Sequence, residues 1–124
     1  MKTILQSHIR LVISGTDDFS NAFGPGTAQL LLGVEKMGSL NQIAKDIGMS
    51  YSKAWKSIRE TEKALGVALI ERNGVNGSSL TKEGEEILAL FQRAHQAAHN
   101  AVQQVLIEEA EKKILINNKN KNIF

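Results

Sequence analysis

The chain contains no cysteine, which excludes disulfide bonds and thiolate metal sites. Proline is nearly absent as well, since Pro25 is the only one. Aromatic residues make up only 5% of the chain, so aliphatic side chains must fill most of the core. A chain without cysteine suits a reducing compartment, and we expect a cytoplasmic protein.

The chain also lacks a long apolar run and a strong charge of one sign. The N-terminal stretch MKTILQSHIRLVISG is interrupted by His8 and Arg10, so we expect no signal peptide and no membrane span. Lys and Arg number 15 against 13 Asp and Glu, a formal net charge of +2. This small excess does not by itself indicate nucleic-acid binding, so local clusters of basic residues matter more. The 124 residues are enough for about one domain.

Residues 38–57 have the sequence GSLNQIAKDIGMSYSKAWKS and predict two helices joined by a tight turn. Ser39 is placed to cap the first helix, and Gln42 follows at the capping-box spacing. Gly48 allows the sharp reversal, because a residue with a Cβ resists positive φ. The buried face of the first helix would consist of Ile43, Ala44 and Ile47. This pattern is typical of a DNA-binding helix-turn-helix, whose second helix lies in the major groove.

The second helix is expected to begin after Ser50, whose hydroxyl can cap it. Its outward face would present hydroxyl and ammonium groups to base edges and phosphates, from Tyr51, Ser52, Lys53 and Lys56. Its inward face is apolar and consists of Ala54, Trp55, Ile58 and Leu65. The alternative interpretation is an ordinary helical hairpin with a solvated polar face.

The segment after this helix predicts a small β-hairpin. A short extended run at residues 69–71 precedes Asn73-Gly74 and Asn76-Gly77, which favour turns because both residue types tolerate positive φ. A helix-turn-helix followed by such a hairpin is a winged helix. The wing tip would present Arg72, Asn73 and Asn76 to the phosphate backbone or to a minor groove. A plain surface loop is the alternative.

Three runs of the sequence also point to a known family. They are FGPGTAQLL from Phe23, GSLNQIAKDIGMSYSKAWKSI from Gly38, and LGVALIERNGVNGSSLTKEGEEIL from Leu65. In this order they resemble the N-terminal DNA-binding domain of the ModE molybdate-responsive regulators, a relative of the LysR-type winged helix. The G-M-S-Y-x-x-A-W segment and the L-T-x-x-G step are the more specific parts. The resemblance extends from about Phe23 to Phe91 and implies DNA binding.

The sequence departs from that family in two respects. ModE wings are commonly longer and richer in glycine and basic residues, so the resemblance supports the wing contacts less than the helix contacts. ModE proteins of full length also carry C-terminal molybdate-binding domains, and we expect none here because too few residues follow Phe91. The resemblance therefore implies nothing about molybdate, and any small-molecule effector stays unknown.

The expected fold class is mainly α with a small β component. A winged helix-turn-helix domain should occupy residues 1–80, with a strand at 4–14 and a helix at 27–36. A long dimerisation helix should occupy residues 81–116, and a flexible tail should follow at 117–124.

The predicted long helix favours a homodimer. Thr81 can cap it. Apolar residues recur along it at spacings of three and four, namely Ile87, Leu90, Phe91, Ala94, Ala98, Ala101, Val105 and Leu106. A helix of this length spans about 50 Å, so its distal half lacks apolar partners within one small domain. We expect it to pair with a second copy about a two-fold axis; the alternative is that the distal part frays in solution.

No pattern in the chain indicates catalysis or a bound cofactor. His95 and His99 are four residues apart, but no third metal ligand stands at a matching local spacing, so we interpret them as solvated or interface histidines. The FGPG sequence at residues 23–26 lacks the length and the lysine of a phosphate loop. No serine lies in a nucleophile elbow. We therefore expect no enzyme, no catalytic residue, no metal and no cofactor.

The predicted function is a sequence-specific, DNA-binding transcriptional regulator that acts as a homodimer on double-stranded DNA. The residues predicted to contact DNA are Ser50, Tyr51, Ser52, Lys53, Lys56, Arg59, Arg72, Asn73 and Asn76. Of these, Arg59 and Arg72 would neutralise phosphates. Two alternatives stay open: a winged-helix module for protein interaction, and a regulator that senses an oxyanion at its dimer interface.

Overall fold

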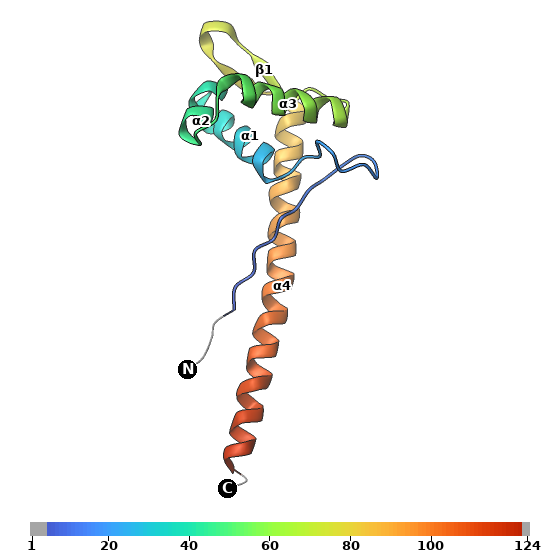
Figure 1. The fold of residues 1–124 in the computed structure, drawn as a ribbon, viewed down its shortest axis with the longest axis vertical. Coiled ribbons are helices and arrows are strands. Elements are labelled where there is room, and N and C mark those ends of the chain that lie inside the picture. The colour runs from blue at the N-terminus through green and yellow to red at the C-terminus, as the bar shows by residue number, and fades with distance from the viewer. Residues whose placement is uncertain (1–4, 123–124) are drawn as a thin grey trace. The chain divides into compact units, whose positions relative to one another are not determined.

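The computed structural model describes the backbone of residues 5–122 and the side chains of residues 5–112. Its elements are helices α1 (Pro25–Met37), α2 (Leu40–Asp46) and α3 (Tyr51–Leu65), strand β1 (Ile70–Arg72), the short 3₁₀-helix η1 (Gly74–Asn76), strand β2 (Ser78–Leu80) and helix α4 (Lys82–Asn122), as Figure 1 shows. The fold is mainly α with a small β component, as predicted. It divides into a compact unit at Arg10–Gln92 and a second unit that joins the described residues up to Ile9 with those from Arg93 onward.

The two helices of the helix-turn-helix begin at the predicted hydroxyl caps. Ser39 Oγ accepts a hydrogen bond from the N–H of Gln42 at 3.1 Å, and Ser50 Oγ accepts one from the first turn of α3 at 3.2 Å. The turn between the helices passes through Gly48 at φ 74°, the left-handed region that glycine tolerates. The Gln42 side-chain amide donates to Asp46 Oδ1 within α2, and its oxygen does not accept from the N–H of Ser39, so only half of the capping box forms.

The core of the Arg10–Gln92 unit is largely aliphatic, as the composition predicts. Its largest fully buried side chains are Phe23, Leu30, Leu31, Leu40, Ile58, Leu69, Leu88 and Val34. The rings of Phe23 and Phe91 meet edge to face with centroids 5.4 Å apart. From α3, Ala54 and Trp55 join this core, whereas Leu65 is only partly buried. Packing of the apolar sides of α1, α2 and α3 fixes the direction in which the polar side of α3 faces.

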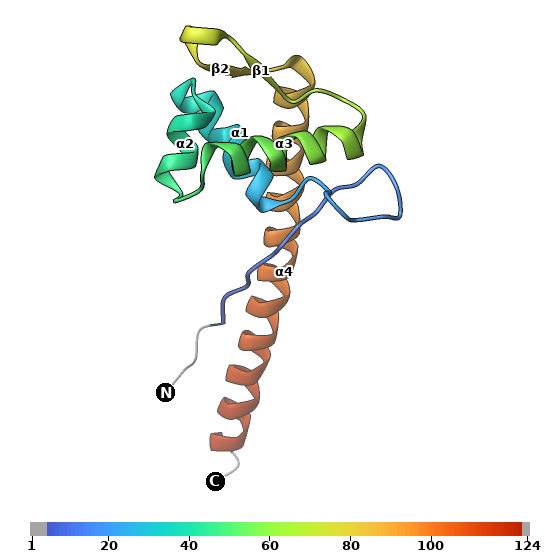
Figure 2. The ribbon, with the colours of Figure 1, turned by 45° about the horizontal axis from the view of Figure 1, so that its top comes forward.

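The strands β1 and β2 form an antiparallel hairpin that contacts the turn between α1 and α2 (Figure 2). Ile70 pairs with Leu80, and Arg72 pairs with Ser78. The N–H of Ser78 donates to the carbonyl oxygen of Gly38 at 2.9 Å. A Cβ on Gly77 would clash with the same oxygen, so glycine permits this close approach. The hairpin is therefore held to the helices by its second strand.

The predicted N-terminal strand is wrong over the described residues 5–14. Only one antiparallel bridge forms there, between Ile13 and Phe23, with both N–H···O distances at 2.8 Å. The apolar residues of this stretch instead pack on the helical core through Leu11 and Ile13. A strand needs a neighbouring strand to accept its hydrogen bonds, and the helices beside this stretch supply none.

The long helix α4 begins as predicted but extends further. Thr81 Oγ1 accepts a hydrogen bond from the N–H of Gly84 at 2.9 Å, which caps the first turn. The helix continues to Asn122, past the predicted end at 116, because residues 117–122 contain no proline or glycine to stop it. Residues 123–124 of the predicted flexible tail lie outside the described residues. In the part of the chain that the structure describes, no helix combines the length and the apolar character needed to cross a membrane.

Candidate nucleic-acid interface

The outward side of α3 presents the residues predicted to contact bases. Tyr51, Ser52, Lys53 and Lys56 are all exposed, whereas Ala54, Trp55 and Ile58 are buried. Within the described residues, neither lysine has an ion pair or a side-chain hydrogen bond. Both ammonium groups therefore face solvent and are accessible to a ligand.

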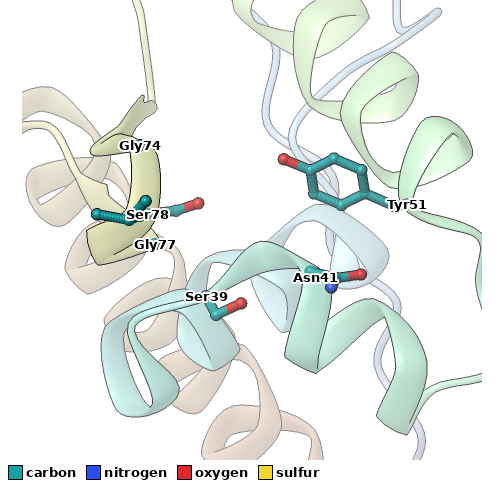
Figure 3. Close-up of a pocket in the computed structure, with 7 residues that line it drawn as sticks. Ser39, Asn41, Tyr51, Gly74, Gly77 and Ser78 are labelled. Atoms are coloured by element: carbon teal, nitrogen blue, oxygen red, sulfur yellow. The ribbon is translucent and has the colours of Figure 1, made fainter.

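A pocket of about 360 Å³ lies between the start of α3, the start of α2 and the hairpin (Figure 3). Its lining residues are Ser39, Asn41, Tyr51, Gly74, Val75, Gly77 and Ser78. Figure 3 shows the Tyr51 side chain reaching from α3 with its hydroxyl directed toward the hairpin. Asn41 is an exposed residue in the first turn of α2 that the sequence motifs do not single out; its outward position in that turn is the only signal for it.

The hairpin tip is uncharged, which corrects the prediction that Arg72 lies there. Arg72 ends β1, and residues 73–77 form the tip, with Val75 fully exposed. The Asn73 N–H donates to the Gly77 carbonyl at 2.8 Å, and the Asn73 side-chain amide donates to Ser79 Oγ at 3.0 Å. As predicted, the turn uses positive φ at Gly74 and Gly77, with values of 60° and 86°. Asn73 and Asn76 are exposed, and the first of them is already fixed within the hairpin.

The indole ring of Trp55 contacts both predicted phosphate-binding arginines. The Cζ atom of Arg59 is 4.6 Å from the ring centroid, and that of Arg72 is 4.2 Å away. The Tyr51 ring meets the indole edge to face with centroids 6.3 Å apart. Residues 51, 55 and 59 share one side of α3 because they are four apart. That spacing is visible in the sequence, but the approach of Arg72 from the hairpin is not.

The carboxylate of Glu62 joins α3 to the start of the hairpin and was not among the predicted site residues. Glu62 is buried, and its Oε1 accepts a hydrogen bond from Arg59 Nη1 at 2.8 Å. Its Oε2 accepts from the backbone N–H groups of Leu69 at 2.6 Å and Ile70 at 3.3 Å. These contacts orient the Arg59 guanidinium and hold the first strand of the hairpin next to α3.

The two histidines of α4 do not form a metal site within the described residues. His95 Nε2 lies 2.9 Å from the carbonyl oxygen of Ile9, and since a carbonyl only accepts, this nitrogen donates the hydrogen bond. His99 is partly buried. Across the described part of the chain, no group of three or more His, Cys, Asp or Glu side chains is arranged to hold a metal ion.

Comparison with known proteins finds a family model that matches the helix-turn-helix and the hairpin. Residues 27–85 match the family model described as "Bacterial regulatory helix-turn-helix protein, lysR family". This segment is a LysR-type helix-turn-helix domain. The LysR-type domain includes both helices of the motif, the hairpin, and every residue predicted to contact DNA.

Curated relatives of the LysR-type domain are named as transcriptional regulators. The chain is 35% identical over 71 residues to the DNA-binding transcriptional dual regulator ModE of Escherichia coli (strain K12), a match that covers 54% of this chain and 27% of that protein. It is 37% identical over 71 residues to the transcriptional regulator ModE of Haemophilus influenzae, covering 54% of this chain and 28% of that protein. The chain thus spans about a quarter of the length of the curated relatives it matches.

A solved structure shares the fold of the LysR-type domain. The crystal structure of the CbnR_DBD-DNA complex superposes with a TM-score of 0.55 at 23% sequence identity. The match covers 66% of this chain and 93% of that one. The two proteins therefore share a fold over the matched part of this chain.

Proposed function

We propose that this protein is a sequence-specific, DNA-binding transcriptional regulator. The observation that carries the proposal is the outward side of α3, where Tyr51, Ser52, Lys53 and Lys56 are exposed within a LysR-type domain. The family description and the names of the curated relatives, which are transcriptional regulators, support the same function. Its target would be chromosomal DNA, so the proposed location is the cytoplasm.

In this proposal α3 lies in the major groove and the hairpin lies on the backbone. The first turn of a recognition helix reaches furthest toward the bases, which assigns Tyr51, Ser52 and Lys53 to base edges. Lys56 is one turn further along and contacts bases or a phosphate. Ser50 caps the start of α3, and from this position it would contact the DNA backbone. These roles follow from position along α3, since each of these side chains is exposed.

The pocket between α3 and the hairpin supports the placement of a DNA strand there. Its lining combines hydroxyl and amide groups with backbone of the hairpin tip, and these are groups that bind sugar and phosphate oxygens. The hairpin tip is uncharged, so Asn73 and Asn76 would contact the backbone or a minor groove by hydrogen bonds rather than as cations. Arg59 and Arg72 would supply the positive charge for phosphates.

We further propose that the protein acts as a homodimer through α4. The predicted apolar stripe divides into residues with different surroundings: Phe91 is buried, Ala94, Ala98 and Leu106 are partly buried, and Leu90, Ala101 and Val105 are exposed. Within the second unit, Ala97, Ala101 and Val105 recur at spacings of four and leave an apolar strip exposed. Small side chains would let a second copy of the helix approach closely, and paired domains would read two half-sites.

Selection of bound duplexes from a random DNA pool by the purified protein tests the function. The expected result is an enriched motif with two-fold symmetry. The matched control is the double variant Lys53→Ala/Lys56→Ala, which changes only exposed side chains and should not recover the motif. If the wild-type protein enriches no sequence even at low salt, the DNA-binding function fails, and a protein-docking role for the winged helix takes its place.

A further inference from the structure

We propose that Trp55 is a positioning residue, whose indole ring holds Arg59 and Arg72 together as a paired guanidinium site for the DNA phosphate backbone. This inference rests on the proposed function, and it assigns to a core residue a role that packing alone does not require. Trp55 itself is 5% exposed, so its ring has almost no surface with which to contact DNA. It acts through the two arginines that lie against its ring.

The Trp55 ring contacts arginines from two different elements, α3 and β1. Arg59 belongs to α3 and Arg72 to β1, and their Cζ atoms lie 4.6 Å and 4.2 Å from the indole centroid. Both arginines are exposed, with 55% of the Arg59 side chain accessible. A guanidinium that stacks on an aromatic ring keeps its N–H edge available for phosphate oxygens. The ring therefore fixes two cations, one from the recognition helix and one from the wing, without blocking their donors.

The choice of tryptophan at this position favours the same role. The Trp55 Nε1 donor is buried, and among the described residues it has no hydrogen-bond partner. An unpaired buried donor is destabilising, and a leucine or phenylalanine would fill a core position without it. Tryptophan offers the best aromatic face for a cation. A ring that holds two guanidinium groups accounts for a residue that carries this penalty.

The two arginines at the Trp55 ring differ in their charged neighbours and therefore in their proposed roles. Arg59 uses Nη1 for the buried Glu62 carboxylate, so its orientation is fixed by an ion pair as well as by the ring. Arg72 has no ion pair within the described residues, and the wing tip beyond it is uncharged. Glu71, its neighbour, points to the opposite face of the strand. The position of Arg72 on Trp55 therefore decides where the wing can meet a phosphate.

The test measures how DNA affinity depends on salt, for the selected site and for a scrambled duplex. Each phosphate contact adds about 0.9 to the slope of log affinity against log salt concentration. Trp55→Leu should weaken binding to both duplexes by the same factor, about five- to thirty-fold, and lower the slope by about one to two. Trp55→Phe retains an aromatic face and should stay within about threefold of wild type. Lys63→Gln, which removes an exposed charge from the last turn of α3, is the control and should leave the slope unchanged.

A second measurement leaves the core position of Trp55 unchanged. Arg59→Gln and Arg72→Gln change exposed side chains, and their combined loss of affinity should be smaller than the product of the single losses, because the two act as one site. Independent effects that multiply would overturn the proposal. So would a folded Trp55→Leu protein with the wild-type slope, and in that case the DNA-binding function would stand. If the wild-type protein binds neither duplex, the proposed DNA-binding function itself is contradicted.

Discussion

The Glu62 carboxylate accepts a hydrogen bond from the backbone N–H of Leu69 at 2.6 Å, across the turn that leads from α3 into the wing. The same side chain accepts from Ile70 and from Arg59, so one buried anion serves three donors. A carboxylate has room for about four such bonds, and these three satisfy most of it. Glu62 thus fixes the position of the wing relative to the recognition helix.

Replacement of this carboxylate should destabilise the domain. Glu62→Ala leaves two buried N–H groups at the start of β1 without an acceptor, and we expect the free energy of unfolding to fall by about 2–4 kcal/mol. Glu62→Gln keeps one acceptor oxygen and should lose less. Urea denaturation followed by circular dichroism measures both values. Glu60→Ala, on the exposed side of the same helix, is the control and should stay within about 0.5 kcal/mol of wild type. Equal losses for Glu60→Ala and Glu62→Ala would contradict the assigned role.

Two helical glycines should respond in opposite ways to alanine. Gly84 is buried in the first turn of α4, where a Cβ would clash with the Leu69 carbonyl oxygen. The Leu69 carbonyl group belongs to the backbone and cannot rotate away as a side chain can. Gly84→Ala should therefore lower the free energy of unfolding by about 1–3 kcal/mol. Gly26 lies in α1, and a Cβ there meets no atom within 4 Å. Gly26→Ala should therefore leave stability unchanged or raise it by up to about 1 kcal/mol. Thermal melting of the two variants beside wild type checks the contrast, and a stabilised Gly84→Ala would show that α4 does not approach Leu69 so closely.

Local features of this fold could be predicted from the sequence, because they depend on residues a few positions apart. The caps at Ser39 and Ser50 and the positive φ at Gly48 follow from side-chain chemistry and backbone sterics alone. The inward side of α3 follows from its periodicity. These features are sufficient to indicate a helix-turn-helix and to place its polar side outward.

Features that depend on distant segments could not be predicted in this way. The contact of Arg72 with Trp55 and the hydrogen bonds of Glu62 require the hairpin to be docked, and nothing in the local sequence specifies that geometry. The N-terminal stretch has a strand-like composition, but the neighbouring elements are helices, so only the Ile13–Phe23 bridge forms. Tertiary packing overrides a weak local preference in such a case.

Substitutions on the recognition helix should separate base contacts from phosphate contacts. Lys53→Ala should weaken binding to the selected site by about 1–3 kcal/mol and relax specificity at one base position. Lys56→Ala should weaken binding to all duplexes alike if it contacts a phosphate. Both side chains are exposed, so neither change should alter the melting temperature. Affinities for the selected and scrambled duplexes distinguish the two roles. If neither variant changes either affinity, α3 is not the recognition helix.

The proposed dimer depends on the exposed apolar strip of α4, and a charge placed in it should separate the two copies. Ala98 is the centre of the stripe predicted from sequence, but it is partly buried within its own chain, whereas Ala101 is exposed between Ala97 and Val105. Ala101→Glu would place a carboxylate against apolar partners in a dimer, which is unfavourable without a matching cation. The protein should then sediment as a monomer. Gln96→Glu adds a negative charge to an exposed position on another face of the helix and should remain dimeric.

The same variant tests the geometry of the operator. A two-fold dimer places its recognition helices in successive major grooves, so half-sites should lie about 10 bp apart, or a whole number of turns. Ala101→Glu should lose most of its affinity for the full site while binding a single half-site as weakly as wild type does. Sedimentation velocity and a gel-shift titration on full and half-sites measure the two effects. A wild-type protein that sediments as a monomer at micromolar concentration, yet binds an asymmetric site tightly, would require the dimer to be abandoned and each LysR-type domain to act alone.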